Sequence, residues 1–175
     1  MSSMLRLAFR RPWLVPAALG AVLLSAAPAG AFERQWHLGG GLGAAAPTDY
    51  ELGPAVGIHG AYGLSDVFDL RLELQASRNG VGSLPVSFYG ARFALAYKVD
   101  VIQWIPYGAI SGGGFAIAWD GAALFRPSVG AMLGLDYAVS RHFGLGALGA
   151  GDYVFVDSGL TVLALLVRAE YRFGW

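Results

Sequence analysis

The sequence predicts an all-β protein: an eight-stranded antiparallel up-and-down transmembrane β-barrel, preceded by a cleavable signal peptide. Three observations lead to this fold. Apolar and polar residues alternate with a period of two, which is the side-chain period of a β-strand. Strand-like segments recur along the chain, with turn residues between them. Glycine supplies 26 of 175 residues and charged residues only 14%, whereas average usage is about 7% glycine and about 25% charged residues.

The first 31 residues have the pattern of an export signal. Three arginines between positions 6 and 11 form a positive start, an apolar stretch covers 13–24, and small residues lead up to Ala31. Signal peptidase prefers such small residues, so we expect cleavage after Ala31 and a barrel domain over 32–175. A retained transmembrane helix over 12–31 is the alternative, but Pro16 and Pro28 interrupt that span.

The first two predicted strands are 34–44 and 54–64, with a loop expected over 45–52. In each strand the large apolar residues lie two positions apart, and small residues or a histidine lie between them. The two apolar faces are Trp36, Leu38 and Leu42 in the first, and Val56, Ile58, Tyr62 and Leu64 in the second. Ser65 and Asp66 predict a tight turn after the second strand.

Alternation is clearest in the third and fourth predicted strands, 68–78 and 86–99. Every second residue from Phe68 is apolar, and the residues between are charged or polar. Asn79-Gly80 predicts the turn between the two strands. In the fourth strand aromatic and aliphatic residues share one face, while Arg92 and Lys98 fall on the other.

The fifth and sixth predicted strands, 104–119 and 126–139, are separated by Asp120-Gly121, which starts a loop. The register of the fifth strand stays open, because Ile105, Tyr107 and Ala109 compete with a glycine-rich alternative. The sixth strand has Val129, Leu133, Leu135 and Tyr137 on one side, and Gly130, Met132, Gly134 and Asp136 on the other.

After a turn at Ser140-Arg141, the seventh predicted strand is 142–155 and the eighth is 163–175. The last strand reads LALLVRAEYRFGW. Every second residue back from its end is apolar or aromatic, while Arg168, Glu170 and Arg172 lie on the other face. We expect this strand to pair with 34–44, because a barrel closes when its first and last strands meet.

Alternation does not by itself say which face meets solvent, since a soluble lipocalin-like barrel puts the apolar face inward. Here the polar face is mainly glycine, alanine and serine, which suits a narrow eight-stranded lumen. Aromatic residues also gather near both strand ends, as expected at two membrane interfaces. The predicted belts are Trp36, Tyr62, Phe68, Tyr97, Trp104, Tyr107, Tyr137, Phe143, Tyr171 and Phe173 at one end, and Tyr89, Phe115, Trp119, Phe125, Tyr153 and Phe155 at the other.

With the apolar faces toward lipid, ten charged residues point into the lumen. They are Asp69, Arg71, Glu73, Arg92, Lys98, Asp136, Asp152, Arg168, Glu170 and Arg172. Both signs are present, and we expect pairing across strands, because an unpaired buried charge is costly. A packed polar plug is the favoured interpretation, and a gated ion path is the alternative.

These features resemble the small outer-membrane β-barrels of the OmpA/OmpX type. The likeness rests on the export signal, eight strands, short turns on one side and the terminal residues YRFGW. It implies a bacterial outer-membrane location, contact with outer-membrane lipid, and reading of Tyr171, Phe173 and Trp175 by the barrel-assembly machinery. We expect a monomer with a structural, protective or surface-interaction role. A narrow ion or small-solute channel is the alternative.

Candidate sites for chemistry are weak. The run 144–149 matches GxGxxG, but a dinucleotide site needs a helix after the glycines, and a strand-like pattern follows. His37, His59 and His142 are far apart and show no paired metal-ligand spacing, so we expect lumen or rim side chains. A lipid A-modifying enzyme of similar fold is a further alternative. We predict no catalysis, cofactor or metal, and a formal net charge of zero gives no reason to expect nucleic acid.

Overall fold

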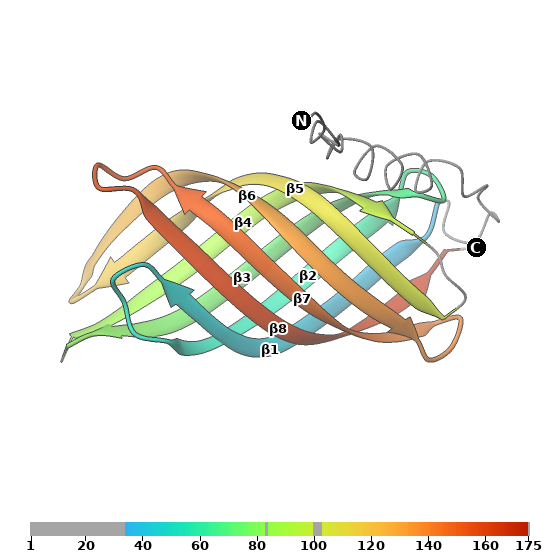
Figure 1. Cartoon of the computed structure of the whole chain (residues 1–175), viewed down its shortest axis with the longest axis horizontal. Coiled ribbons are helices and arrows are strands. Elements are labelled where there is room, and N and C mark those ends of the chain that lie inside the picture. Colours follow the sequence, from blue (N-terminus) through green and yellow to red (C-terminus); the bar gives the residue numbers. More distant parts are fainter. Residues whose placement is uncertain (1–33, 83, 100–102, 175) are drawn as a thin grey trace, which may run out of the picture.

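The protein is a closed barrel of eight antiparallel strands in which each strand pairs with the next in sequence (Figure 1). The computed structural model describes residues 34–82, 84–99 and 103–174. The strands are β1 (Trp36–Pro47), β2 (Gly53–Gly63), β3 (Phe68–Val81), β4 (Leu84–Lys98), β5 (Trp104–Trp119), β6 (Ala122–Ala138), β7 (Phe143–Val154) and β8 (Leu160–Phe173). The predicted eight-stranded antiparallel barrel is confirmed, and the predicted signal peptide lies outside the described residues. Within the described ranges, no helix is long and apolar enough to cross a membrane.

Pairing of β1 with β8 closes the barrel. The register runs from Trp36 opposite Phe173 to Pro47 opposite Val162, so the two strands meet along the whole length of β1. Closure leaves no open sheet edge. This matters in lipid, where an unpaired backbone N–H or C=O group costs several kcal/mol. The expected pairing of the first and last strands is confirmed.

Several strand boundaries differ from the sequence prediction. Ala45 to Pro47 continue β1 instead of beginning a loop, because they pair with β8. Asn79 and Gly80 lie inside β3, and the chain turns two residues later, at Gly82 (φ 58°). The reason is visible at Asn79, whose buried side-chain amide donates hydrogen bonds to the carbonyl oxygens of Ala45 (2.8 Å) and Glu51 (2.9 Å). That amide ties β3 to the connection between β1 and β2.

The connection between β5 and β6 is a two-residue turn. Trp119 pairs with Ala122, and both central residues, Asp120 and Gly121, have positive φ angles of 41° and 78°. Asp-Gly is a preferred sequence for the type I′ turn, whose twist matches that of the flanking strands. The sixth strand therefore begins at Ala122, four residues earlier than predicted, and no loop intervenes.

Two aromatic belts surround the outer face. At the terminal end, which we define as the end of the barrel where Trp36 and Phe173 lie, aromatic rings contact one another across neighbouring strands. Ring centroids are 4.8 Å apart for Trp36 and Tyr62, 5.4 Å for Phe68 and Tyr97, and 4.8 Å for Trp104 and Tyr137. The loop end, at the opposite side, exposes Tyr89, Trp119, Phe125, Tyr153 and Phe155.

The outer face between the belts is apolar and exposed. Leu42, Ile110, Leu133 and Val167 are 70% to 74% exposed. The ten charged residues predicted for the lumen are buried inside the barrel instead, at most 4% exposed. This is the reverse of a water-soluble barrel, and it matches the arrangement of a transmembrane β-barrel. The lipocalin-like alternative is therefore wrong.

Glycines in the lumen lie directly opposite long or bulky side chains on the next strand. Gly134 is paired with Tyr107, Gly146 with Asp136, and Gly130 with Asp152. A Cβ atom added at any of these glycines would overlap the facing side chain or its backbone. The high glycine content therefore makes room for the lumen residues.

Replacing a lumen glycine by alanine should destabilise the barrel. We expect Gly134→Ala to lower the free energy of unfolding by about 1 to 3 kcal/mol, the usual cost of overpacking, because its Cβ would meet the Tyr107 ring. The matched control is Gly112→Ala on the outer face, where a Cβ meets no atom within 4 Å. Urea titration of the refolded protein in lipid vesicles measures both. Equal stability of the two variants would contradict this account of the glycines.

Candidate functional site: the charged lumen

The ten charged residues predicted for the lumen all lie inside the barrel. They come from β3, β4, β6, β7 and β8, and each is at most 4% exposed. Five carry a positive charge and five a negative charge, so the set is balanced while the histidines are neutral. Balance matters because the desolvation cost of a buried charge is recovered only through close opposite charges and hydrogen bonds.

Arg92 forms the link nearest the loop end. Its Nη2 atom lies 3.2 Å from Glu73 Oε2 and donates a hydrogen bond of 3.0 Å to Gln75 Oε1. Its Nη1 atom is bonded to Asp152. Glu73 and Gln75 are on the neighbouring strand β3, whereas Asp152 is on β7. The planar guanidinium fork can hold several oxygens at once, and here it connects strands that are not neighbours in the wall.

Arg168 forms a second link through the middle of the lumen. Its Nε and Nη2 atoms contact the two Asp136 carboxylate oxygens at 3.0 and 2.5 Å. Such a bidentate pair is among the strongest charge-assisted hydrogen-bond arrangements. The same guanidinium lies 4.0 Å from Glu73 and 3.9 Å from Glu170. Arg168 on β8 therefore couples β6, β3 and its own strand.

Asp69 anchors a cluster closer to the terminal end. Lys98 Nζ lies 2.6 Å from Asp69 Oδ1, and Arg71 Nη2 lies 3.5 Å from Oδ2. The Arg71 and Arg168 guanidinium carbons lie 4.2 and 4.8 Å from the centre of the Tyr107 ring. Cation–π attraction at this distance is favourable, and more so where water is excluded. Tyr107 thus joins the Asp69 cluster to the Arg168 link.

Glu170 is the centre of the remaining contacts. Its Oε1 atom accepts hydrogen bonds from Arg172, at 2.7 Å from Nε, and lies 2.6 Å from Nη2. His37 Nδ1 lies 3.5 Å from Oε1, and His59 Nε2 lies 3.4 Å from Oε2. Both histidines are buried, and they approach the carboxylate from β1 and β2. The carboxylate therefore connects β8 with the first two strands, across the closure.

Little space is left between these side chains. The cavity bounded by His59, Glu73, Gln75, Arg92 and Arg168 has a volume of about 10 Å³, which is about the space of one water molecule. Phe88, Phe115, Val154 and Val162 fill the lumen on the loop-end side and are at most 1% exposed. This arrangement is suited to holding strands together and leaves no wide path through the middle.

Two aromatic side chains lie elsewhere than the sequence indicated. Tyr107 and Phe115 were expected in the outer belts, but both face the lumen and are 4% and 1% exposed. Tyr107 is thus a member of the network that sequence reasoning missed. A usable signal was present: pairing strands back from the Asp120-Gly121 turn places Tyr107 opposite Gly134, on the same face as Asp136.

The other candidate residues are placed as follows. Tyr171 and Phe173 face outward in the terminal belt, 54% and 43% exposed. Trp175 and the predicted cleavage point after Ala31 lie outside the described residues. Residues 144–149 belong to β7 and lead into more strand, so the helix required of a dinucleotide site is missing there. The part of the chain that the structure describes holds no group of three or more His, Cys, Asp or Glu that could bind a metal ion.

Comparison with solved structures places this fold among small outer-membrane barrels. Neisserial surface protein A matches with a TM-score of 0.67 and 16% identity, covering 79% of this chain and 97% of its own. OprG from Pseudomonas aeruginosa gives 0.59 and 12%, covering 83% and 99%. Ail of Yersinia pestis gives 0.55 and 15%, covering 81% and 100%. The chain thus has the fold of the small eight-stranded outer-membrane β-barrels. No protein-family model and no curated protein sequence matches it.

Replacing one member of a lumen ion pair should destabilise the barrel more than replacing both members. We expect Arg168→Gln alone to lower the free energy of unfolding by about 3 to 5 kcal/mol, because it leaves Asp136 as an uncompensated buried charge. Adding Asp136→Asn should recover part of that loss, giving a coupling of about 1 to 3 kcal/mol in a double-mutant cycle.

Urea unfolding of the four proteins in vesicles completes the cycle. Arg78→Gln serves as a matched control, since Arg78 is exposed on β3 and should change stability by less than about 0.5 kcal/mol. Strict additivity of the Arg168 and Asp136 substitutions would contradict a direct, energetically coupled pair.

Proposed function

We propose that this chain is an integral protein of the bacterial outer membrane with a structural, protective or surface-interaction role. Its exposed apolar wall and two aromatic belts support insertion into a bilayer. The likeness to three outer-membrane barrels supports the same location. In this proposal the partners of the outer face are membrane lipids, the protein is a monomer, and the chain is exported by way of its first 31 residues.

The observation that carries the structural role is the filled, charge-balanced lumen. Arg92 connects β4 with β3 and β7, and Arg168 connects β8 with β6 and β3. These ion pairs connect non-neighbouring strands across the lumen and so stabilise the barrel wall from within. An ion crossing the middle of the lumen would have to displace them, because the cavity beside them holds about 10 Å³.

Catalysis is not part of the proposal. A lipid A-modifying enzyme would place its reactive side chains at the outer rim, but His37 and His59 are buried beside Glu170 in the lumen. His142, the third histidine of the chain, lies in the turn between β6 and β7 at the terminal end. A narrow channel is the second candidate. Polar side chains follow one another along the lumen, from Asp69 near the terminal end to Arg92 near the loop end.

The folded protein should not conduct ions. In planar bilayers we expect no stepwise current from the wild-type protein at voltages of either sign, because Arg92 and Arg168 close the lumen. Folding is checked by heat-dependent migration on gels. The variant Arg92→Ser should stay silent as well, because Arg168 and the apolar cluster of Phe88, Phe115, Val154 and Val162 still fill the lumen. Stable unitary currents from folded wild-type protein would favour the channel instead.

The aromatic residues at the end of β8 are proposed to be read by the barrel-assembly machinery. We expect Tyr171→Ala with Phe173→Ala to slow appearance of the folded band in vesicles that contain the purified machinery. The control is Phe68→Ala with Tyr97→Ala, which removes a ring pair from the same belt on β3 and β4. If both double variants assemble at the same reduced rate, the effect belongs to the belt and the recognition proposal fails.

A further inference from the structure

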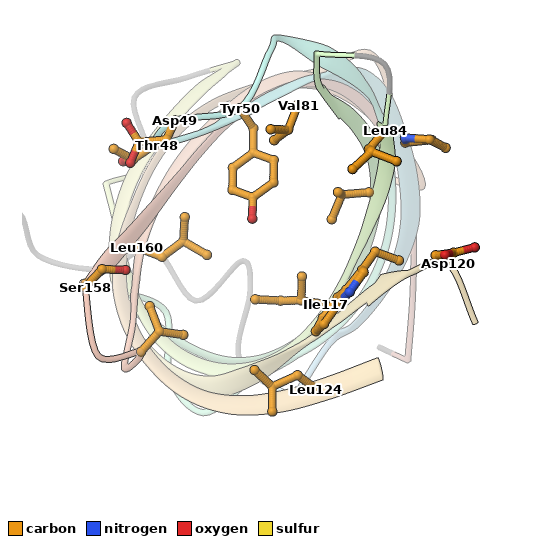
Figure 2. Close-up of a pocket in the computed structure, with 15 residues that line it drawn as sticks. Thr48, Asp49, Tyr50, Val81, Leu84, Ile117, Asp120, Leu124, Ser158 and Leu160 are labelled. Atoms are coloured by element: carbon orange, nitrogen blue, oxygen red, sulfur yellow. The ribbon is translucent and has the colours of Figure 1, made fainter. Parts of the chain in front are cut away.

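An apolar cavity opens at the loop end of the barrel and is separate from the charged lumen. Its volume is about 700 Å³, which is within the range of small-molecule sites, about 300 to 1,000 Å³. We call it the apolar cup and define its wall by Val86, Ile117, Leu124, Val156 and Leu160. Figure 2 shows Ile117, Leu124 and Leu160 bordering the central space from different sides.

The floor of the apolar cup closes it from below. Phe88, Phe115, Val154 and Val162 form one buried cluster with the wall residues Val86, Ile117 and Leu160. Beneath this cluster lie Gln75, Arg92 and Asp152, the loop-end part of the ion network. The cup therefore ends on an apolar floor and does not continue into the charged lumen.

One hydroxyl group projects into this apolar space. Tyr50 lies in the connection between β1 and β2, and its ring packs edge-on against Phe88, with centroids 5.0 Å apart and planes at 88°. Figure 2 shows the ring extending from the rim toward the middle of the cavity, with the hydroxyl oxygen leading. Thr48 and Ser158 also belong to the lining, and a mainly apolar cavity with a few placed polar groups is the usual composition of a site for a small organic ligand.

The charge at the rim selects among such ligands. Asp49 and Asp120 are charged members of the described lining, which contains no Lys, Arg or His. Asp157 lies close by in the connection that also supplies Val156 and Ser158. Like charges near a site raise the cost of binding, while an opposite charge lowers it. A carboxylate or phosphate head is therefore disfavoured at the mouth, and a cationic or uncharged head is favoured.

We propose that the apolar cup binds a small amphipathic molecule with one alkyl chain or a compact ring system and a cationic or neutral head. The apolar body lies against Ile117, Leu160 and the Phe88 floor. The head remains at the rim near Asp49 and Asp120, and the Tyr50 hydroxyl provides a hydrogen-bonding group for the ligand. This site lies beyond the structural role proposed above and does not depend on it.

The test uses full-length mature protein in phosphatidylcholine nanodiscs, with 1-aminoanthracene as a fluorescent apolar probe. Wild-type protein should give a saturable rise in emission above that of empty nanodiscs. Ile117→Trp, which fills the cup, should weaken probe binding by at least about tenfold, or about 1.4 kcal/mol. The matched control Ile110→Trp makes the same change on the outer face of β5 and should leave the affinity unchanged.

Competition identifies the head group. Decylamine and decanol should displace the probe, and decanoate, with the same chain length, should need at least about ten times the concentration. The paired substitution Asp49→Asn with Asp120→Asn keeps the cup and should remove most of this difference. If Ile117→Trp shows no heat-dependent shift on gels and so has not folded, this paired substitution still tests the proposal.

Three results would overturn the proposal. Equal probe emission from empty and protein-containing nanodiscs would mean that the probe only partitions into lipid. Unchanged binding in folded Ile117→Trp would place the probe outside the cup. Equal displacement by decanoate and decylamine would remove the assigned head-group preference.

Discussion

The narrow interior of an eight-stranded wall is the constraint on which this structure depends. Side chains must fill that interior, because eight strands leave too little room for a wide channel. Ten charged groups and the Tyr107 ring occupy it here, and they fit because glycines lie opposite the large side chains, Gly134 opposite Tyr107 and Gly146 opposite Arg168. Large and small lumen side chains therefore alternate between neighbouring strands, just as positive and negative charges do. A composition that would weaken a soluble sheet is what lets this wall close around long side chains.

Electrostatics then decides how the filled interior behaves. The ten lumen charges are five positive and five negative, and Arg92, Arg168 and Glu170 each contact residues from several strands. Arginine suits this position because its fork serves several carboxylates and its flat face lies against Tyr107. The backbone hydrogen bonds join each strand to its neighbours, whereas the ion pairs join strands across the lumen. Together they resist both shearing and flattening of the barrel.

Sequence alone predicted the barrel, the closing pair of strands and the face on which the ten lumen charges lie. Those features follow from a period of two, which is strong wherever Leu alternates with Arg, Asp or Glu, as in β3. Where small residues occupy both faces of a strand, the alternation does not show which face is inside. Tyr107 was therefore assigned to the wrong face, because its strand also carries Gly112 to Gly114. Strand ends depend on distant partners, such as Asn79 with Ala45. The lining of the apolar cup comes from four separate parts of the chain, 48–50, 81–86, 117–124 and 156–160, so no local sequence pattern predicts it.

Seven of the eight strand pairings join strands that follow one another directly, and only the contact between β1 and β8 spans the whole sequence. Local pairing costs little loop-closure entropy, whereas that single seam bears nearly all of it. The barrel therefore has no intrinsic beginning or end apart from the place where the chain is cut. Because Trp36 lies opposite Phe173, joining these neighbours and opening the Ser65 turn instead would move the seam to β2 and β3. We expect such a circularly permuted chain to form the same wall and the same lumen, because every strand keeps its two neighbours.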